Sequence, residues 1–232
     1  MTTRTRFHQG LDSLKNKLLA MGGVAENAVE MAVRAYRERV PELCQKVFEK
    51  ETLINLAERE IDELAIDLLA MQQPMAVDLR LILAVIKSNA DLERVGDQAV
   101  NIAQRVMDLI ALPQVELAAD IPQMAATSSQ MVRQALEAFV SGDIEASQKL
   151  LETDDIVDRM NQEIFLAMDK TMRESPQYAR QALDTIIIAR NLERIADHAT
   201  NIAEDVIFWV RGADVRHRYA TSLVSSSVNP EN

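Results

Sequence analysis

Two pairs of carboxylates, each spaced by four residues, recur 100 positions apart in this 232-residue chain. Glu93 and Asp97 lie in the stretch DLERVGDQAVNIAQR, and Glu193 and Asp197 lie in the similar stretch NLERIADHATNIAED. Residues four apart are neighbours on a helix, so each pair of like charges destabilises the helix unless a counter-charge neutralises it. A hard cation could bind both carboxylates, and oxygen ligands favour Mg²⁺, Mn²⁺, Ca²⁺ or iron over metals that prefer thiolates. The spacing therefore indicates a candidate metal site in each copy.

A metal site of this kind needs ligands from a second helix, and acidic residues precede each pair at a similar distance. Asp154 and Asp158, again four apart, precede the second pair, while Glu51 and Asn55 stand 103 residues earlier at the equivalent positions of the first copy. Because Asn55 replaces a carboxylate, we expect the first site to bind its cation less firmly than the second. Three further acids lie on the same two segments: Glu49, Glu58 and Asp155. The predicted metal ligands are Glu51, Glu93, Asp97, Asp154, Asp158, Glu193 and Asp197.

An arginine-paired surface would explain the same carboxylates without a metal. Arg94 and Arg194 stand three residues before Asp97 and Asp197, a spacing that permits ion pairs along a helix. A solvated face is free to differ between the two copies of a repeat, whereas Glu, Arg, Asp and Asn agree in both. Because of this agreement, the sequence supports a metal site and an arginine-paired surface equally. His198, next to Asp197, is expected to be a hydrogen-bonded surface residue rather than a metal ligand.

The composition predicts an all-α protein. Only 6 Gly, 6 Pro and 4% aromatic residues accompany abundant Ala, Leu, Glu, Met and Arg, which favour helices over strands. The Gly and Pro residues divide the chain into six segments, with a weak point at Met21–Val24 and a helix C-cap at Gly212. We expect helices over residues 7–40, 41–71, 76–111, 123–140, between 141–143 and 173–176, and 177–210.

The six segments form two matching sets of three, which indicates an internal duplication. REIDEL in the first half resembles QEIFLA in the second, and MQQP falls where RESP falls. Apolar residues in each repeated stretch follow alternating steps of three and four, as expected of a core-facing helix. Three antiparallel helices bury such a seam better than two do. We therefore predict two tandem, sequence-related three-helix bundles, residues 1–112 and 119–212, with residues 213–232 outside both.

Charge and motifs argue against several classes of function. A net charge of −11 opposes broad nucleic-acid binding, and the single Cys44 cannot form an internal disulfide. The chain has no phosphate-binding P-loop motif and no Ser/His/Asp arrangement, so we expect no enzyme. A di-metal oxidase in a helical bundle would need His where Gly96 and Ala196 stand. Without a signal peptide or a membrane-spanning run, the expected location is the cytoplasm. A metal-binding protein and a metal-free helical scaffold are both left open.

The stretches QQPMAVDLRLILAVIKSNADLERVGDQAVNIA and NLERIADHATNIAEDVIFWVRG resemble the two halves of the PhoU family of phosphate-transport accessory proteins. The resemblance covers nearly the whole chain. It implies a cytoplasmic, non-enzymatic regulator that works with the phosphate ABC transporter and its sensor histidine kinase. When phosphate is plentiful, such a regulator keeps the phosphate-starvation response off and restrains uptake. The resemblance also implies homodimers, membrane contact only through partners, and metals such as Mg, Mn, Fe or Zn at Glu93/Asp97, Asp154/Asp158 and Glu193/Asp197.

Overall fold

The computed structural model describes residues 3–71 and 74–212, and within them the chain forms long α-helices and no strand. The expected all-α fold is confirmed. The tail at residues 213–232, which the sequence places beyond both bundles, lies outside the described residues. The helices are α1 (Thr3–Glu38), α2 (Pro41–Met71), α3 (Ala76–Ile110), α4 (Ile121–Ser141), α5 (Ile144–Glu174) and α6 (Ala179–Arg211), with a 3₁₀ turn at Pro176–Tyr178.

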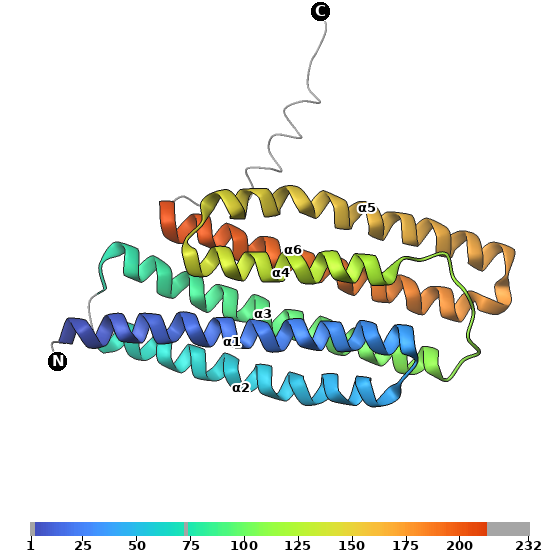
Figure 1. The fold of residues 1–232 in the computed structure, drawn as a ribbon, viewed down its shortest axis with the longest axis horizontal. Helices are drawn as coiled ribbons and strands as arrows, with labels where there is room; N and C mark the ends of the chain where they lie inside the picture. The colour runs from blue at the N-terminus through green and yellow to red at the C-terminus, as the bar shows by residue number, and fades with distance from the viewer. Residues whose placement is uncertain (1–2, 72–73, 213–232) are drawn as a thin grey trace, which may run out of the picture.

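Two three-helix bundles lie side by side (Figure 1). Helices α1, α2 and α3 pack against one another, as do α4, α5 and α6. The bundles meet through α3 against α6 and α1 against α4, whereas α2 and α5 contact only their own halves. The outer flanks of the molecule are therefore α2 and α5. None of the helices in residues 3–71 and 74–212 combines the length and hydropathy that crossing a bilayer requires.

Local sequence explains where the second-half helices begin and end. The Asp120 carboxylate accepts a hydrogen bond from the Gln123 backbone N–H at 3.1 Å, which caps α4, and Pro122 fits the first turn of that helix. Gly142 ends α4 with φ 68°, and Asp143 caps α5 through the Ala146 N–H at 3.0 Å. One helix thus stops where the next one starts, which holds α4 and α5 as a tight antiparallel pair.

The apolar seams predicted from the repeated stretches form the core. Leu92, Val95, Ala99 and Ile102 of α3 are completely buried, and so are their α6 counterparts Leu192, Ile195, Ala199 and Ile202. Since α3 and α6 occupy equivalent places in the two bundles and also pack on each other, they form the centre of the molecule. The carboxylates of the repeated stretches therefore project from the two most firmly packed helices.

The glycine pair in α1 does not interrupt the helix, contrary to the expected weak point at Met21–Val24. Gly22 instead lies where α1 crosses α4. A Cβ added there would overlap the Leu136 side chain, so the absence of a side chain lets the two bundles approach closely. Gly23 faces open space, with no atom within 4 Å of an added Cβ. Only the first glycine of the pair has a packing role.

This difference predicts opposite effects for the same substitution. Gly23→Ala should raise the free energy of unfolding by about 0.5–1 kcal/mol, because Ala is the better helix former and meets nothing there. Gly22→Ala should lower it, because Leu136 must move. Denaturant unfolding measures both changes. In a Leu136→Ala background the penalty at Gly22 should disappear, and a penalty that persists there would contradict the proposed close approach.

Candidate metal centres

The four predicted ligands of the second half face one another across α5 and α6. Burial raises the pKa of Asp154 to about 6, and the charges of Asp197, Asp158, Asp155 and Glu193 raise it as well. Burial is also the main cause of the raised pKa of Asp197, followed by the charge of Asp158. The charges of neighbouring carboxylates therefore disfavour ionisation of Asp154 and Asp197, as expected of acids that lie near one another. The structure brings together the residues that the sequence analysis grouped.

Glu193 of this second cluster has one partnered and one unpartnered oxygen. Arg190 Nη1 donates to Glu193 Oε1 at 2.8 Å, while Oε2 is buried and has no hydrogen-bond partner among the described residues. Its pKa is raised, chiefly by burial, with Arg190 opposing the shift. A buried carboxylate oxygen without a donor is costly unless a cation or water satisfies it.

The first-half cluster is built in the same way from α2 and α3. Burial raises the pKa of Glu93, and the charges of Asp97, Glu58 and Glu51 add to this effect. The Asn55 side-chain oxygen is buried and has no hydrogen-bond partner in the described part of the chain. An amide oxygen and carboxylates together are a suitable ligand set for a hard cation.

Glu58 is a member of this cluster that the predicted ligand set left out. Burial raises its pKa, and the charges of Asp62 and Asp97 raise it further. Its equivalent in the second half, 103 positions later, is Asn161, just as Asn55 is the equivalent of Asp158. Each half therefore holds four carboxylates and one asparagine, so ligand number no longer favours the second site. The signal in the sequence was the spacing of Glu51, Asn55 and Glu58 by four and then three, which places them on one helix face.

The clusters are not closed coordination shells. Among the described residues no three His, Cys, Asp or Glu side chains converge tightly enough to hold a metal ion as they stand. Both clusters nevertheless contain a buried, unpartnered oxygen, on Asn55 and on Glu193. The residues present thus fit a hard cation in composition and in unsatisfied acceptors, and a bound ion would have to draw the side chains inward.

Within the described residues, neither arginine of the repeated stretches forms a direct ion pair with the aspartate that follows it. Arg94 Nη1 lies 3.9 Å from Asp91 rather than beside Asp97. In the second half Glu193 takes its ion pair from Arg190, and the residues described show no such pair between Arg194 and Asp197. The arginine-paired alternative therefore lacks its direct contacts, although the charge of Arg194 opposes the rise in the pKa of Asp197 and of Glu193.

His198 and the repeated asparagine Asn201 belong to the contact between the bundles. His198 Nδ1 lies 2.9 Å from Asp91 Oδ1, and Asn201 Nδ2 donates to the same oxygen at 3.1 Å. The expected hydrogen bond of His198 is confirmed, but its side chain is only 14% exposed, so its expected place on the surface is wrong. Sequence reasoning did not foresee its partner, because the two residues are 107 positions apart.

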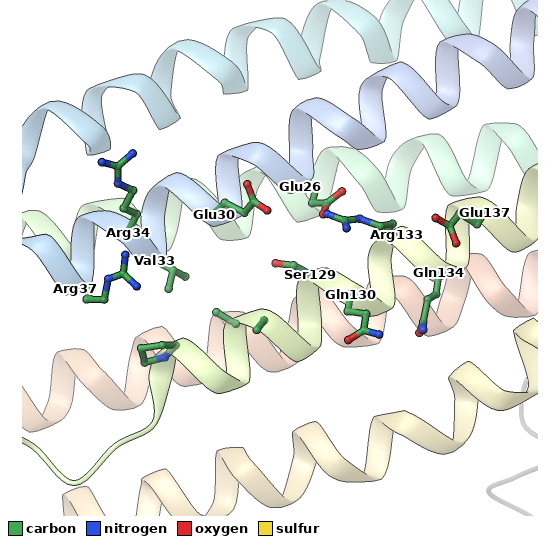
Figure 2. Close-up of a pocket in the computed structure, with 13 residues that line it drawn as sticks. Glu26, Glu30, Val33, Arg34, Arg37, Ser129, Gln130, Arg133, Gln134 and Glu137 are labelled. Atoms are coloured by element: carbon green, nitrogen blue, oxygen red, sulfur yellow. The ribbon is translucent and has the colours of Figure 1, made fainter.

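A groove lies elsewhere, between α1 and α4, and contains none of the predicted ligands. It measures about 660 Å³ and has Arg34 and Arg37 at one end and Glu26 and Glu30 towards the other (Figure 2). Arg133 of α4 pairs with Glu26 across it. A smaller hollow of about 570 Å³ adjoins the second cluster and is lined by Asp158, Asn161, Gln162, Phe165, Ile186, Arg190 and Glu193.

Comparison with known proteins agrees with the two-bundle architecture. The PhoU domain family model matches residues 18–106 and 121–206. A phosphate-specific transport system accessory protein PhoU homolog of Pseudomonas aeruginosa is 39% identical, covering 91% of this chain and 88% of the relative. The Escherichia coli accessory protein PhoU is 30% identical over 91% and 88% of the two chains.

Solved structures show the same fold. The crystal structure of PhoU from Pseudomonas aeruginosa superposes with a TM-score of 0.85 at 38% identity, covering 89% of this chain and all of the other. That of the phosphate transport system regulatory protein PhoU from Streptococcus pneumoniae gives 0.83 at 25% identity, covering 90% and 99%. The chain therefore belongs to the PhoU family, a helical family of accessory and regulatory proteins rather than of enzymes.

Proposed function

We propose that this protein is a cytoplasmic negative regulator of the phosphate-starvation response and a modulator of high-affinity phosphate uptake. In this role it is an adaptor between the phosphate ABC transporter and its sensor histidine kinase. The observation that carries the proposal is the family match over both halves, together with relatives named as accessory proteins of phosphate-specific transport. Regulation by contact suits a chain built from packed helices.

The two outer flanks support the adaptor role, because they are related but not identical. Leu53 of α2 and Ile156 of α5 are exposed at equivalent positions, 103 residues apart. Beyond them the flanks differ, since α5 exposes Phe165 and Leu166 where α2 carries Asp62 and Glu63. Exposed apolar side chains mark candidate contact surfaces. Two flanks of different character suit two different partners.

We further propose that the chain forms a homodimer and that the carboxylate clusters hold cations. The ion would be Mg²⁺ or Mn²⁺, or alternatively iron or zinc. A bound ion would neutralise the repelling carboxylates and link α2 to α3 and α5 to α6. The raised pKa values of Asp154 and Glu93 and the unpartnered oxygens of Asn55 and Glu193 support this assignment. Sedimentation equilibrium measures the oligomeric state.

Deleting the gene tests the regulatory proposal. Expression of a phosphate-starvation reporter in phosphate-rich medium should rise to the level of starved cells, and phosphate uptake should increase. Reintroducing the wild-type gene should restore repression. Reintroducing Phe165→Ser/Leu166→Ser should not restore repression. The variant Leu53→Ser/Leu56→Ser, which removes two exposed leucines from α2, tests the other flank in the same way. Unchanged reporter output in the deletion strain would remove the regulatory assignment.

A metal-free helical scaffold is the second candidate. The observation in its favour is that no three acidic side chains converge in the described residues. Elemental analysis of purified protein separates the two, because a metal-binding regulator should retain about stoichiometric metal after dialysis. The oxidase alternative lacks its ligands, because Gly96 and Ala196 stand where the Glu-x-x-His motif needs histidine.

A further inference from the structure

A row of basic side chains follows the seam between α3 and α6. Arg80, Lys87 and Arg94 of α3 are spaced by seven and so lie along one side of the helix. All three border α6: Arg80 Nε donates to the Trp209 carbonyl at 3.2 Å and Lys87 Nζ lies 3.5 Å from Asp205. Arg94 lines a small hollow with Asn201. The row is therefore held in place by the contact between the bundles.

The internal repeat extends this row along α6. Arg180 and Arg194 are the equivalents of Arg80 and Arg94, and Arg105 and Arg180 meet at Asp108, at 2.9 and 3.2 Å. We name the strip that carries Arg80, Lys87, Arg94, Arg105, Arg180 and Arg194 the α3/α6 face.

The carboxylates that balance these cations lie beneath them. Asp91, Asp184 and Asp205 are 7%, 1% and 3% exposed, whereas the side chains of Arg94 and Arg180 are 59% and 56% exposed. The surface therefore presents guanidinium groups, and the balancing charge is buried except at Asp108, which pairs with Arg105 and Arg180 and is 42% exposed. Arg94 is too far from Asp91, at 3.9 Å, for a hydrogen bond. Each guanidinium has five N–H donors and prefers paired oxygens such as those of a phosphate.

Exposed leucines mark both ends of the α3/α6 face. Leu83 is 38% exposed and Leu183 is 45% exposed, at equivalent positions of the antiparallel α3 and α6. Basic residues beside apolar ones on one helical surface are typical of segments that lie on membranes. The face runs the length of α3, about 50 Å for its 35 residues.

We propose that the α3/α6 face binds the phosphate headgroups of an anionic phospholipid surface. This contact goes beyond the proposed adaptor role, which needs membrane contact only through partners. An extended surface fits better than a single anion, because a hollow of about 320 Å³ on the seam is also lined by Asp91 and Asp205. An anion entering that hollow would meet both carboxylates, whereas headgroups lying above it meet the exposed ends of Lys87 and Arg94.

The distribution of charge orients the molecule on such a surface. The flanking α2 and α5 each carry eight acidic residues, against three and four basic ones. Helices α3 and α6 each carry five acidic and four basic residues, and part of their acid is buried. An anionic membrane therefore repels the flanks more strongly than the centre, and the exposed basic row favours an approach through the α3/α6 face.

Vesicle co-sedimentation of the purified full chain tests the proposal. The protein should bind phosphatidylglycerol vesicles at low ionic strength, should not bind phosphatidylcholine vesicles, and should be released in about 1 M salt, where the screening length falls to about 3 Å. Arg94→Gln/Arg194→Gln should weaken the partition coefficient by roughly 10- to 30-fold, on the basis of the usual contribution of each basic residue. Arg94→Lys/Arg194→Lys should retain most of the binding.

Matched controls distinguish a specific face from net charge. Arg34→Gln/Arg37→Gln removes the same two charges from the α1/α4 groove and should leave vesicle binding unchanged. Equal losses in both double variants would overturn the proposal, as would equal binding to both lipids. Failure of the folded wild type to bind phosphatidylglycerol would also overturn the proposal. An acidic protein partner would then be the remaining candidate for the α3/α6 face. Circular dichroism of each variant verifies folding. Since no transporter or kinase is present, these outcomes are independent of the adaptor role.

Discussion

In metal-free protein, Asp154→Asn should stabilise the fold by about 1–2 kcal/mol at about pH 7.5, with no effect near pH 4. Burial, followed by the charges of Asp197 and Asp158, raises the pKa of Asp154 to about 6. Asparagine keeps the shape of the side chain and removes the charge that its neighbours repel. The stated gain is smaller than the full pKa shift would give, because Asp154 is partly exposed to solvent.

The raised pKa sets the direction of the pH dependence. A carboxyl whose pKa is higher in the folded than in the unfolded chain favours folding while it is protonated. Its contribution is complete below about pH 4 and is lost as the pH rises through about 6. Urea unfolding of wild type and Asp154→Asn with a chelator present measures this loss, because the other titrating groups are common to both proteins. A stability difference that stays at zero across this range would contradict the repulsion.

Mn²⁺ should make the wild type more stable than Asp154→Asn, the reverse of the order in metal-free protein. A cation that binds only the folded chain stabilises it by about 2.7 kcal/mol at a free concentration 100 times its Kd. The wild type should show this gain, and Asp154→Asn should lose most of it with one ligand removed. Opposite signs without and with metal distinguish a metal site from a solvated acidic face, which Mn²⁺ would not stabilise in either protein.

Calorimetry extends the comparison to both halves. Asp97→Asn and Asp197→Asn should each remove one binding event, and the two events should have similar affinities because Glu58 gives the first half its fourth carboxylate. Negligible heats in wild type and both variants would mean that the repeated carboxylates have a structural role without metal. The regulatory function would then rest on partner binding alone.

Helix positions were predictable from sequence where local groups determine them. Asp120 and Asp143 cap their own helices, and Gly142 supplies the left-handed end of α4, so these boundaries need no information from distant residues. The starts of α1 and α6 differ from the predicted Phe7 and Gln177 by a few residues, in keeping with the loose definition of helix ends.

The candidate sites were predictable only in part, because their partners come from separate helices. Repetition indicated the carboxylates of α3 and α6, and the four-residue step indicated those of α5. Glu58 was left out because its equivalent, Asn161, is not acidic, and only the packing of α2 on α3 brings it to Glu93. The pairing of Asp91 with His198 depends on the contact between the bundles, which periodicity within one helix cannot reveal.

Arg39→Ala should lower the free energy of unfolding by about 1.5–2.5 kcal/mol, a loss expected when a charged donor to partly buried carbonyls is removed. Arg39 lies in the turn between α1 and α2, and its Nη2 donates to the carbonyls of Leu109, Ile110 and Leu112 at 2.6, 3.2 and 2.5 Å. The Leu109 and Ile110 carbonyls belong to the last turn of α3, and the Leu112 carbonyl follows just beyond it. The Leu109 carbonyl also accepts the Leu112 backbone N–H at 3.1 Å, so Arg39 supplements the backbone at this helix end. One side chain from the first turn therefore caps the central helix some 70 residues away along the chain.

A second substitution at Arg39 distinguishes the loss of the hydrogen bonds from the release of backbone strain. Its φ of 56° lies in the left-handed region that favours glycine, so Arg39→Gly relieves strain while losing the same hydrogen bonds. Arg39→Gly should therefore be less destabilising than Arg39→Ala by about 1 kcal/mol, and both should be less stable than wild type. Arg39→Lys retains the charge but not the fork of donors, and should fall between wild type and Ala. Chemical denaturation of the four proteins gives the ranking, and an Arg39→Gly variant as stable as wild type would show that the three hydrogen bonds contribute little beyond offsetting the strain at this position.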